Sequence, residues 1–308
     1  MWGMRIVVTR RVPEAALVEL RALGEVVVSD ADRPLTQEEL QEAVAGASAI
    51  VSMLHDRIDG AVADAAGPQL RVVANVAVGY DNIDVPALVE RGVVVTNTPD
   101  VLTDATADLT FGLLLALTRR IAEGDRLLRA RKPWSFHLGF MLGSGLQGKT
   151  LGIIGPGQIG KAVARRAEAF GMRVVYSGRS QPKEDLLRVA DVVSLHCPLT
   201  PETRHLIDAK ALSAMKHTAF LINTTRGPVV DESALADALL ANEIAGAGLD
   251  VFEREPEVEP RLLELDNVVL TPHLGSATVE TRTEMALLAA RNVAAVLNGE
   301  EPVNPVRR

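Results

Sequence analysis

Short apolar runs alternate with longer amphipathic stretches along most of the chain. The runs are rich in Val and Ile, and they form two series separated by about fifty residues of different character. They cover residues 5–9, 25–29, 49–54, 70–74 and 93–97, and then 150–155, 172–177, 191–196, 219–223, 246–251 and 267–271. Strands that alternate with helices form parallel sheets joined by crossover helices. Because the runs are almost continuously apolar, we expect helices on both faces of each sheet.

The stretches between the runs predict helices, of which residues 13–23 and 37–44 are early examples. Residues 103–128 predict one long helix with Thr103 as its N-cap, and residues 278–297 predict a last amphipathic helix that ends at Asn298-Gly299. We therefore predict an α/β fold of two doubly wound parallel-sheet domains. Residues 1–97 plus 281–308 form the first domain in this prediction, and residues 98–280 form the second.

Composition narrows the classes of protein that remain. The 308 residues include 32 Lys and Arg against 40 Asp and Glu, a net charge of −8, which disfavours binding to nucleic acid because that needs a basic face. No apolar run is long enough to span a bilayer. The single cysteine, Cys197, excludes an intrachain disulfide and favours a cytoplasmic location, and the six scattered histidines show no zinc-site spacing. We expect no metal.

A glycine-rich turn follows the first run of the second series. Gly155-Pro156-Gly157-Gln158-Ile159-Gly160 matches the pattern GxGxxG and lies between a predicted strand and a predicted helix, the context that makes this pattern informative. Its glycines allow a tight turn, a close approach to a pyrophosphate and close helix–strand packing. The free N–H groups at the helix start then bind the anion. The sequence thus predicts a dinucleotide site.

The end of the next predicted strand bears on the choice of cofactor. It reads Tyr176-Ser177-Gly178-Arg179-Ser180 and contains no carboxylate. A carboxylate there would bind a ribose 2′-hydroxyl and repel a 2′-phosphate, whereas Arg and Ser can bind the phosphate. We therefore predict a preference for NADP(H), with Ser177, Arg179 and Ser180 around the phosphate, and NAD(H) as the alternative cofactor.

Three ionisable residues lie just past predicted strand ends in the second series: Arg226, Glu255 and His273. Reduction of a 2-keto acid needs a cation for the carboxylate, a proton donor for the carbonyl oxygen, and a carboxylate that keeps the donor protonated. Arg, His and Glu supply these three groups. The acidic run around Glu255 also contains Glu253 and Glu257, and the residue pattern alone does not choose among the three.

Four motifs occur in the order and spacing that they have in the D-isomer-specific 2-hydroxyacid dehydrogenases, and the chain most resembles the glyoxylate/hydroxypyruvate reductases of that family. The motifs are the glycine turn, TTRGPVVDE, GAGLDVFEREP and PHLGSAT. The resemblance covers essentially the whole chain. It implies a flavodoxin-like substrate-binding domain, a Rossmann dinucleotide-binding domain and a cleft between them. It implies hydride transfer from NAD(P)H to glyoxylate or hydroxypyruvate to give the D-2-hydroxy acid, and a homodimer.

The resemblance also assigns roles to individual positions. It makes Arg226, Glu255 and His273 the catalytic residues, and it selects Glu255 from the acidic run. The substrate carboxylate is expected on Arg226 and on the backbone N–H groups of Val78 and Gly79, within Val76–Asp84. Besides the glycine turn and residues 177–180, the cofactor positions implied by the resemblance are Thr106, Cys197, Pro198, Thr224, Asp250, Gly275 and Ser276.

Some features leave alternatives open. The stretches 179–191 and 256–267 are shorter than this group leads one to expect. Either Trp134 or Phe136, in KPWSFHLGF, stands where these reductases carry a tryptophan that reaches the partner's active site. A D-3-phosphoglycerate dehydrogenase-type enzyme or another D-2-hydroxyacid dehydrogenase remains the alternative among enzymes. A nucleotide-sensing, corepressor-like binding module is the alternative from a different class.

Overall fold

A computed structural model describes residues 3–31, 33–178 and 182–306. The chain divides into two compact units: unit 1 comprises Met1–Leu102 and Thr278–Arg308, and unit 2 comprises Thr103–Ala277. The unit boundaries fall at residues 102/103 and 277/278. The sequence predicted them at residues 97/98 and 280/281. Unit 1 is thus built from both ends of the chain, and unit 2 from its middle.

The described part of unit 1 contains a five-stranded parallel sheet in the order β2-β1-β3-β4-β5, the flavodoxin-like order. Its strands are β1 (Arg5–Val8), β2 (Glu25–Val28), β3 (Ala49–Ser52), β4 (Val72–Asn75) and β5 (Val94–Thr96). Every residue of the central strands β3 and β4 is buried. This explains their continuous apolar character, because both of their faces are covered.

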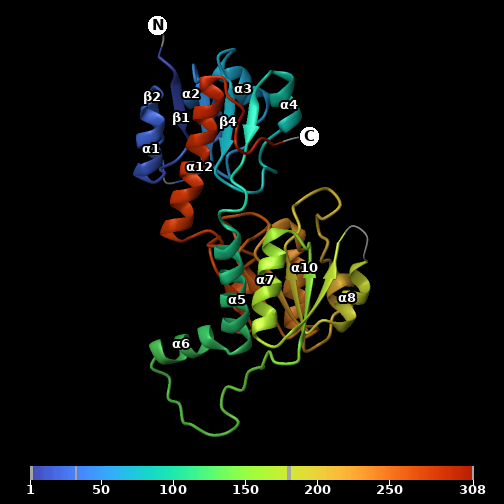
Figure 1. Cartoon of the computed structure of the whole chain (residues 1–308). Helices are drawn as coiled ribbons and strands as arrows, with labels where there is room; N and C mark the ends of the chain where they lie inside the picture. The colour runs from blue at the N-terminus through green and yellow to red at the C-terminus, as the bar shows by residue number, and fades with distance from the viewer. Residues whose placement is uncertain (1–2, 32, 179–181, 307–308) are drawn as a thin grey trace. The chain divides into compact units, whose positions relative to one another are not determined.

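Helices cover both faces of this sheet. They are α1 (Glu14–Arg21), α2 (Gln37–Val44), α3 (Gly60–Ala66), α4 (Val85–Glu90) and α12 (Val279–Asn298). Helix α12 packs beside α1 and against β3, β4 and β5 (Figure 1), and its small buried residues Ala289 and Ala290 allow close contact with the strands. The last helix of the chain is therefore an integral part of the first unit.

The described part of unit 2 contains a six-stranded parallel sheet in the order β11-β10-β9-β8-β6-β7. Its strands are β6 (Thr150–Ile154), β7 (Arg173–Ser177), β8 (Val192–Leu195), β9 (Phe220–Asn223), β10 (Gly246–Leu249) and β11 (Val268–Leu270). The chain reverses direction across the sheet between β6 and β8, a switch point where ligands bind at the carboxyl ends of strands. Strand β7 is the edge strand in the described residues, whereas a full Rossmann sheet has one more strand beyond it. In the described residues between β7 and β8, 182–191, the chain forms a helix at residues 183–189 and no further strand.

Helices also cover both faces of the second sheet. They are α5 (Thr103–Thr118), α6 (Ile121–Arg129), α7 (Gln158–Ala169), α8 (Lys183–Val189), α9 (Ala209–Ser213), α10 (Glu232–Leu240) and α11 (Pro260–Leu263), with a 3₁₀ turn at Gly227–Val229. Helices α5 and α7 lie side by side on one face (Figure 1), and α8, α9, α10 and α11 contribute to the apolar core on the other. None of the helices that the structure describes combines the length and the apolar run needed to cross a bilayer.

The prediction of one helix over residues 103–128 is wrong, because the structure contains two helices, α5 and α6. Arg120 has φ +55°, the left-handed region, which ends the first helix. The carbonyl of Thr118 accepts a hydrogen bond from the Ser144 N–H at 2.8 Å. The hydrophobic periodicity of residues 103–128 continues across residues 119–120, so the sequence pattern did not reveal the break between α5 and α6.

Candidate active site

The glycine turn joins β6 to α7 at the carboxyl edge of the unit 2 sheet. Gly155 has φ +94°, and a Cβ there would lie 2.6 Å from the Cys197 nitrogen; a Cβ on Gly160 would lie 2.5 Å from the Gly155 carbonyl oxygen. Both positions therefore require glycine. A Cβ on Gly157, by contrast, would meet nothing within 4 Å, so the backbone here faces open space.

Helix α7 begins at Gln158, followed by Ile159, and no side chain among the described residues caps its first turn. The N–H groups of this turn therefore face the open space beside Gly157 and are available to an anion. The residues present fit the pyrophosphate of a dinucleotide.

Of the residues assigned to a 2′-phosphate, Arg179 and Ser180 lie outside the described residues. Ser177 is the last residue of β7 and is 3% exposed. Its carbonyl accepts the N–H of Gly155 at 3.0 Å, so the edge strand supports the start of the glycine turn.

The loop after β8 begins with His196, Cys197 and Pro198. The imidazole of His196 contacts the Ser194 hydroxyl at 2.8 Å, and burial lowers the pKa of this histidine to about 3. Burial raises the pKa of the Cys197 thiol to about 11. Neither group is charged at neutral pH. Pro198 is exposed at the same edge.

Three threonines join α5 to this edge of the sheet. The hydroxyl of Thr106 donates to the Gly275 carbonyl at 3.2 Å, and that of Thr110 donates to the Thr106 carbonyl at 2.8 Å. The hydroxyls of Thr110 and Thr224 lie 3.0 Å apart. The start of α5 is thus bonded both to the loop that follows β11 and to the loop that follows β9.

His273 and Glu255 form a hydrogen-bonded pair. Nδ1 of His273 lies 2.9 Å from Oε2 of Glu255, and the two side chains are 24% and 17% exposed. The other carboxylate oxygen, Oε1, accepts the N–H of Phe252 at 3.0 Å. The contact at Nδ1 fixes the orientation of the imidazole ring relative to the loop that carries Glu255. The structure therefore gives Glu255, rather than its acidic neighbours, the place beside the imidazole.

Asp250 organises the loop that carries His273. Its carboxylate, on a residue that is 1% exposed, accepts the Thr271 hydroxyl at 2.6 Å and the N–H groups of Leu274 and Gly275 at 2.7 and 2.8 Å. Burial of this carboxyl raises its pKa. The Asp250 carbonyl accepts the N–H of His273, which adopts φ +53°. Ser276, the next residue after this turn, is half-buried.

Arg226 follows β9 and precedes the 3₁₀ turn. Its Nη1 donates to the Thr225 carbonyl at 2.9 Å, and its own carbonyl accepts the Asn223 amide at 3.0 Å. The next residue, Gly227, packs directly on the loop after β10, since a Cβ there would lie 1.9 Å from the carbonyl carbon of Phe252. This close approach holds the Arg226 loop against the loop that carries Glu255.

Comparison with known proteins decides the family. Residues 111–275 match the family described as D-isomer specific 2-hydroxyacid dehydrogenase, NAD binding domain. The chain is 47% identical to the glyoxylate reductase of Thermococcus onnurineus, over 99% of this chain and 96% of that protein. The chain belongs to the D-isomer-specific 2-hydroxyacid dehydrogenase family. The matched residues all lie in unit 2, which is consistent with the fit of its glycine turn to a nicotinamide dinucleotide.

Solved structures of similar proteins agree with the fold. The TT0316 protein of Thermus thermophilus has a TM-score of 0.94 and 49% identity, over 99% of this chain and 100% of that one. An NADPH-dependent glyoxylate/hydroxypyruvate reductase of Sinorhizobium meliloti, in complex with NADP and malonate, has a TM-score of 0.85 and 36% identity, over 99% of each chain. The chain is thus an NAD(P)-dependent oxidoreductase with the two α/β domains of this family.

A second carboxylate–imidazole pair, between Glu253 and His205, lies close to this site and was missed by sequence reasoning. Nε2 of His205 lies 2.6 Å from a carboxylate oxygen of Glu253. The other carboxylate oxygen of Glu253 accepts the N–H of Glu232 at 3.3 Å, and Glu232 in turn accepts the N–H of Glu253. Burial raises the pKa of Glu232. This cluster fastens the start of α10 to the loop that carries Glu255.

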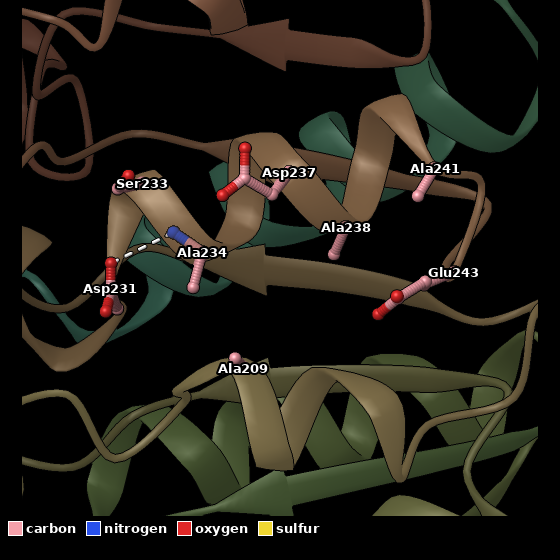
Figure 2. Close-up of a pocket in the computed structure, with 8 residues that line it drawn as sticks. All are labelled: Ala209, Asp231, Ser233, Ala234, Asp237, Ala238, Ala241 and Glu243. Atoms are coloured by element: carbon pink, nitrogen blue, oxygen red, sulfur yellow. Dashed lines mark hydrogen bonds between the residues drawn. The ribbon is translucent and has the colours of Figure 1, made fainter.

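A hollow of about 370 Å³ between α9 and α10 is separate from these residues (Figure 2). Small and acidic residues line it. Two of its three acidic side chains have structural partners: Asp231 caps α10 by accepting the Ala234 N–H at 3.0 Å, and Asp237 pairs with Arg261. The structure thus gives this hollow no part in the chemistry at the carboxyl edge.

We expect Gly157→Ala to weaken cofactor binding at least about tenfold, or ~1.4 kcal/mol, because a methyl group would occupy the space that a pyrophosphate needs. Folding stability should change by less than about 1 kcal/mol, the scale of an altered helix N-cap. Fluorescence titration with NADPH and NADH and urea unfolding measure the two quantities. Gly112→Ala on α5, where a Cβ also meets nothing within 4 Å, is the control. Unchanged cofactor affinity in Gly157→Ala would contradict this assignment.

We expect the Cys197 thiol of the folded protein to react slowly with an aromatic disulfide reagent at neutral pH. The rise in its pKa from 9.0 to about 11 lowers the reactive thiolate fraction about 100-fold, and burial restricts access further. The same protein in urea should release one equivalent of product rapidly, because it has a single cysteine. Equal rates with and without urea would show that this thiol is neither buried nor protonated.

Proposed function

We propose that this protein is an NAD(P)H-dependent glyoxylate/hydroxypyruvate reductase that converts a small 2-keto acid to the D-2-hydroxy acid. The 2.9 Å bond between His273 and Glu255 carries the proposal, because it provides a braced acid–base group in the unit that holds the dinucleotide turn. The glyoxylate reductase of Thermococcus onnurineus, at 47% identity, supports the choice of substrate. Unit 2 is the dinucleotide-binding domain in this proposal, and unit 1 the substrate-binding domain.

Each of the catalytic residues has a distinct task in this proposal. The nicotinamide, when bound, supplies the hydride. The guanidinium of Arg226 binds the substrate carboxylate, and the N–H groups of Val78 and Gly79 in unit 1 bind the same group. Nε2 of His273 donates a proton to the carbonyl oxygen. The carboxylate of Glu255 holds the imidazole in one tautomer and stabilises its protonated form.

The remaining cofactor assignments belong to the same proposal. Around the glycine turn we place the cofactor against Thr106, Cys197, Pro198, Thr224, Asp250, Gly275 and Ser276, which all lie at the carboxyl edge of the unit 2 sheet. Preference for NADP(H) is supported by the absence of a carboxylate in Tyr176–Ser180, and by a relative at 36% identity whose structure contains NADP.

The lone free cysteine supports a cytoplasmic location, since a reducing compartment preserves it.

We also propose that the protein is a homodimer that pairs through α6 and the segment after it. No residue of α6, which is described in full, is buried, and this arm projects away from the unit 2 sheet (Figure 1). Large apolar side chains are exposed along it: Ile121, Leu128, Trp134, Phe136, Leu138 and Leu142. Monomers rarely leave such a stretch in water. Light scattering of purified protein tests the proposal, and a mass near that of one chain, 32.9 kDa, at micromolar concentration would refute it.

A substrate panel with both cofactors tests the proposed activity. Glyoxylate, hydroxypyruvate, pyruvate and 3-phosphohydroxypyruvate should be assayed with NADPH and with NADH. We expect the first two to show the highest kcat/KM. Preference for the phosphorylated acid would support the phosphoglycerate dehydrogenase-type alternative. Cofactor binding without turnover of any of these acids would support the corepressor-like binding module.

We expect Glu255→Gln to lower kcat for keto-acid reduction at least about tenfold, or ~1.4 kcal/mol in the barrier, because the neutral amide holds the imidazole of His273 less firmly than the carboxylate does. The KM for NADPH should stay unchanged. Steady-state kinetics with glyoxylate and NADPH measure both values. The control is Glu257→Gln, an exposed neighbour of the same charge. A wild-type kcat in Glu255→Gln would contradict the pairing.

We expect Arg179→Ala to raise the KM for NADPH about tenfold or more while changing the KM for NADH little, since only NADPH carries the 2′-phosphate that an arginine can bind. Steady-state kinetics with both cofactors provide the comparison. Arg188→Ala, on α8, removes an equal charge from the exposed surface and serves as the control. Equal effects of Arg179→Ala on the two cofactors would refute the 2′-phosphate assignment.

A further inference from the structure

Asn75 is the last residue of β4, and its side chain is completely buried. Its Nδ2 donates to the Gly79 carbonyl at 2.9 Å and to Oδ1 of Asn82 at 3.2 Å. Its Oδ1 accepts the Ser52 hydroxyl, from the neighbouring strand β3, at 3.0 Å. The amide nitrogen therefore has acceptors and the amide oxygen has a donor. These bonds fix the orientation of the amide, with its nitrogen toward Gly79.

A carbonyl that is held on one side determines where the next N–H points, because the peptide unit is planar. The bond from Asn75 to the Gly79 carbonyl therefore directs the N–H of Tyr80 to the opposite side. The same reasoning applies one residue earlier, where the Asn97 amide donates to the Val78 carbonyl at 2.8 Å and so directs the N–H of Gly79.

The series extends to a third peptide. The N–H of Thr98 donates to the Ala77 carbonyl at 2.9 Å, which directs the N–H of Val78. All three donors come from the carboxyl ends of β4 and β5, so three successive carbonyls face the sheet and three successive N–H groups face away from it. Within the described residues, the N–H groups of Val78, Gly79 and Tyr80 donate to no protein acceptor. Successive N–H groups of this kind form an anion-binding concavity.

Asn82 extends this arrangement to a second loop of unit 1. Its Nδ2 donates to the carbonyls of Met53 and Asp56, at 3.1 and 2.9 Å. The loop after β3 and the loop after β4 are thus joined through a pair of contacting amides, Asn75 and Asn82. A change in the first amide would alter the position of both loops.

We propose that Asn75 is a positioning residue of the carboxylate-binding loop: it touches no substrate atom, and it presents the N–H groups of residues 78–80 to a small carboxylate. The inference rests on the proposed function, which assigns the substrate carboxylate to Val78 and Gly79. The N–H groups of residues 78–80 bind the carboxylate of a 2-keto acid in this proposal. The contacting amides of Asn75 and Asn82 also fix the loop after β3.

Asn75→Asp tests the inference, since it keeps the side-chain shape but replaces the donor with an oxygen that repels the Gly79 carbonyl. We expect the KM for glyoxylate to rise at least about tenfold, kcat to change less than KM, and the KM for NADPH to stay unchanged. A large rise in the KM for glyoxylate with a smaller change in kcat indicates weaker substrate binding with an intact chemical step. The matched control is Asn298→Asp, the same substitution at the exposed end of α12, which should leave all three values unchanged.

Ser52→Ala provides a second variant with a smaller change, because it removes one bond that orients the Asn75 amide and adds no charge. We expect a severalfold rise in the KM for glyoxylate in the same direction. A folded Asn75→Asp protein with the wild-type KM would overturn the inference. If Asn75→Asp does not fold, a wild-type KM in Ser52→Ala would overturn it instead.

Binding of oxamate, a stable carboxylate analogue of the substrate, separates this inference from the proposed function. In ¹⁵N-labelled wild-type protein, oxamate should shift the amide resonances of Val78 and Gly79, and these shifts should be lost in Asn75→Asp, or reduced in Ser52→Ala. A wild type that binds oxamate in this way but reduces no keto acid would refute the proposed function and leave the role of Asn75 supported. Absence of oxamate-induced shifts at residues 78–80 in the wild type would overturn the inference.

Discussion

The loop that carries His273 is built around one buried carboxylate. Asp250 accepts a hydroxyl and two N–H groups with its side chain and another N–H with its carbonyl. These bonds close the chain tightly enough for His273 to adopt a left-handed backbone conformation. In that conformation the imidazole meets Glu255, whose own loop is held by Phe252, Glu253 and the close approach of Gly227. The acid–base pair therefore depends on backbone placement more than on the pair's own attraction.

The two units fix the loops at the carboxyl edges of their sheets with different polar side chains. Each has a parallel sheet whose loops must be fixed at the carboxyl edge, where strand pairing no longer satisfies the backbone. Unit 2 uses a buried carboxylate, Asp250, which accepts several N–H groups and leaves them pointing inward. Unit 1 uses the side-chain amides of the buried Asn75 and the half-buried Asn82, which donate to carbonyls and leave N–H groups facing outward. A loop organised by donors suits an anion, because the groups that remain exposed are themselves donors.

The sequence predicted the strands and helices α1, α2 and α12 well because their burial is regular. Helix α2 has the predicted ends, and the strands differ from prediction by one or two residues. Helices α3 and α4 were missed, since each spans seven residues or fewer and produces almost no periodicity. Choosing Glu255 within its acidic run needed the family resemblance, and the structure supplies the physical reason: Glu253, two residues away, is engaged by His205 instead. The hydrogen bonds of Asn75 join residues from three segments, and no local pattern predicts them.

The division of unit 1 between the two ends of the chain has a consequence for biosynthesis. Unit 2 is complete once residue 277 has been made, whereas β3 and β4 remain without one of their covering helices until α12 emerges. During translation the middle of the chain can therefore fold first, while an apolar sheet face of the earlier segment stays open to chaperones. Helix α12 must therefore leave the ribosome before β3 and β4 can reach their final packing.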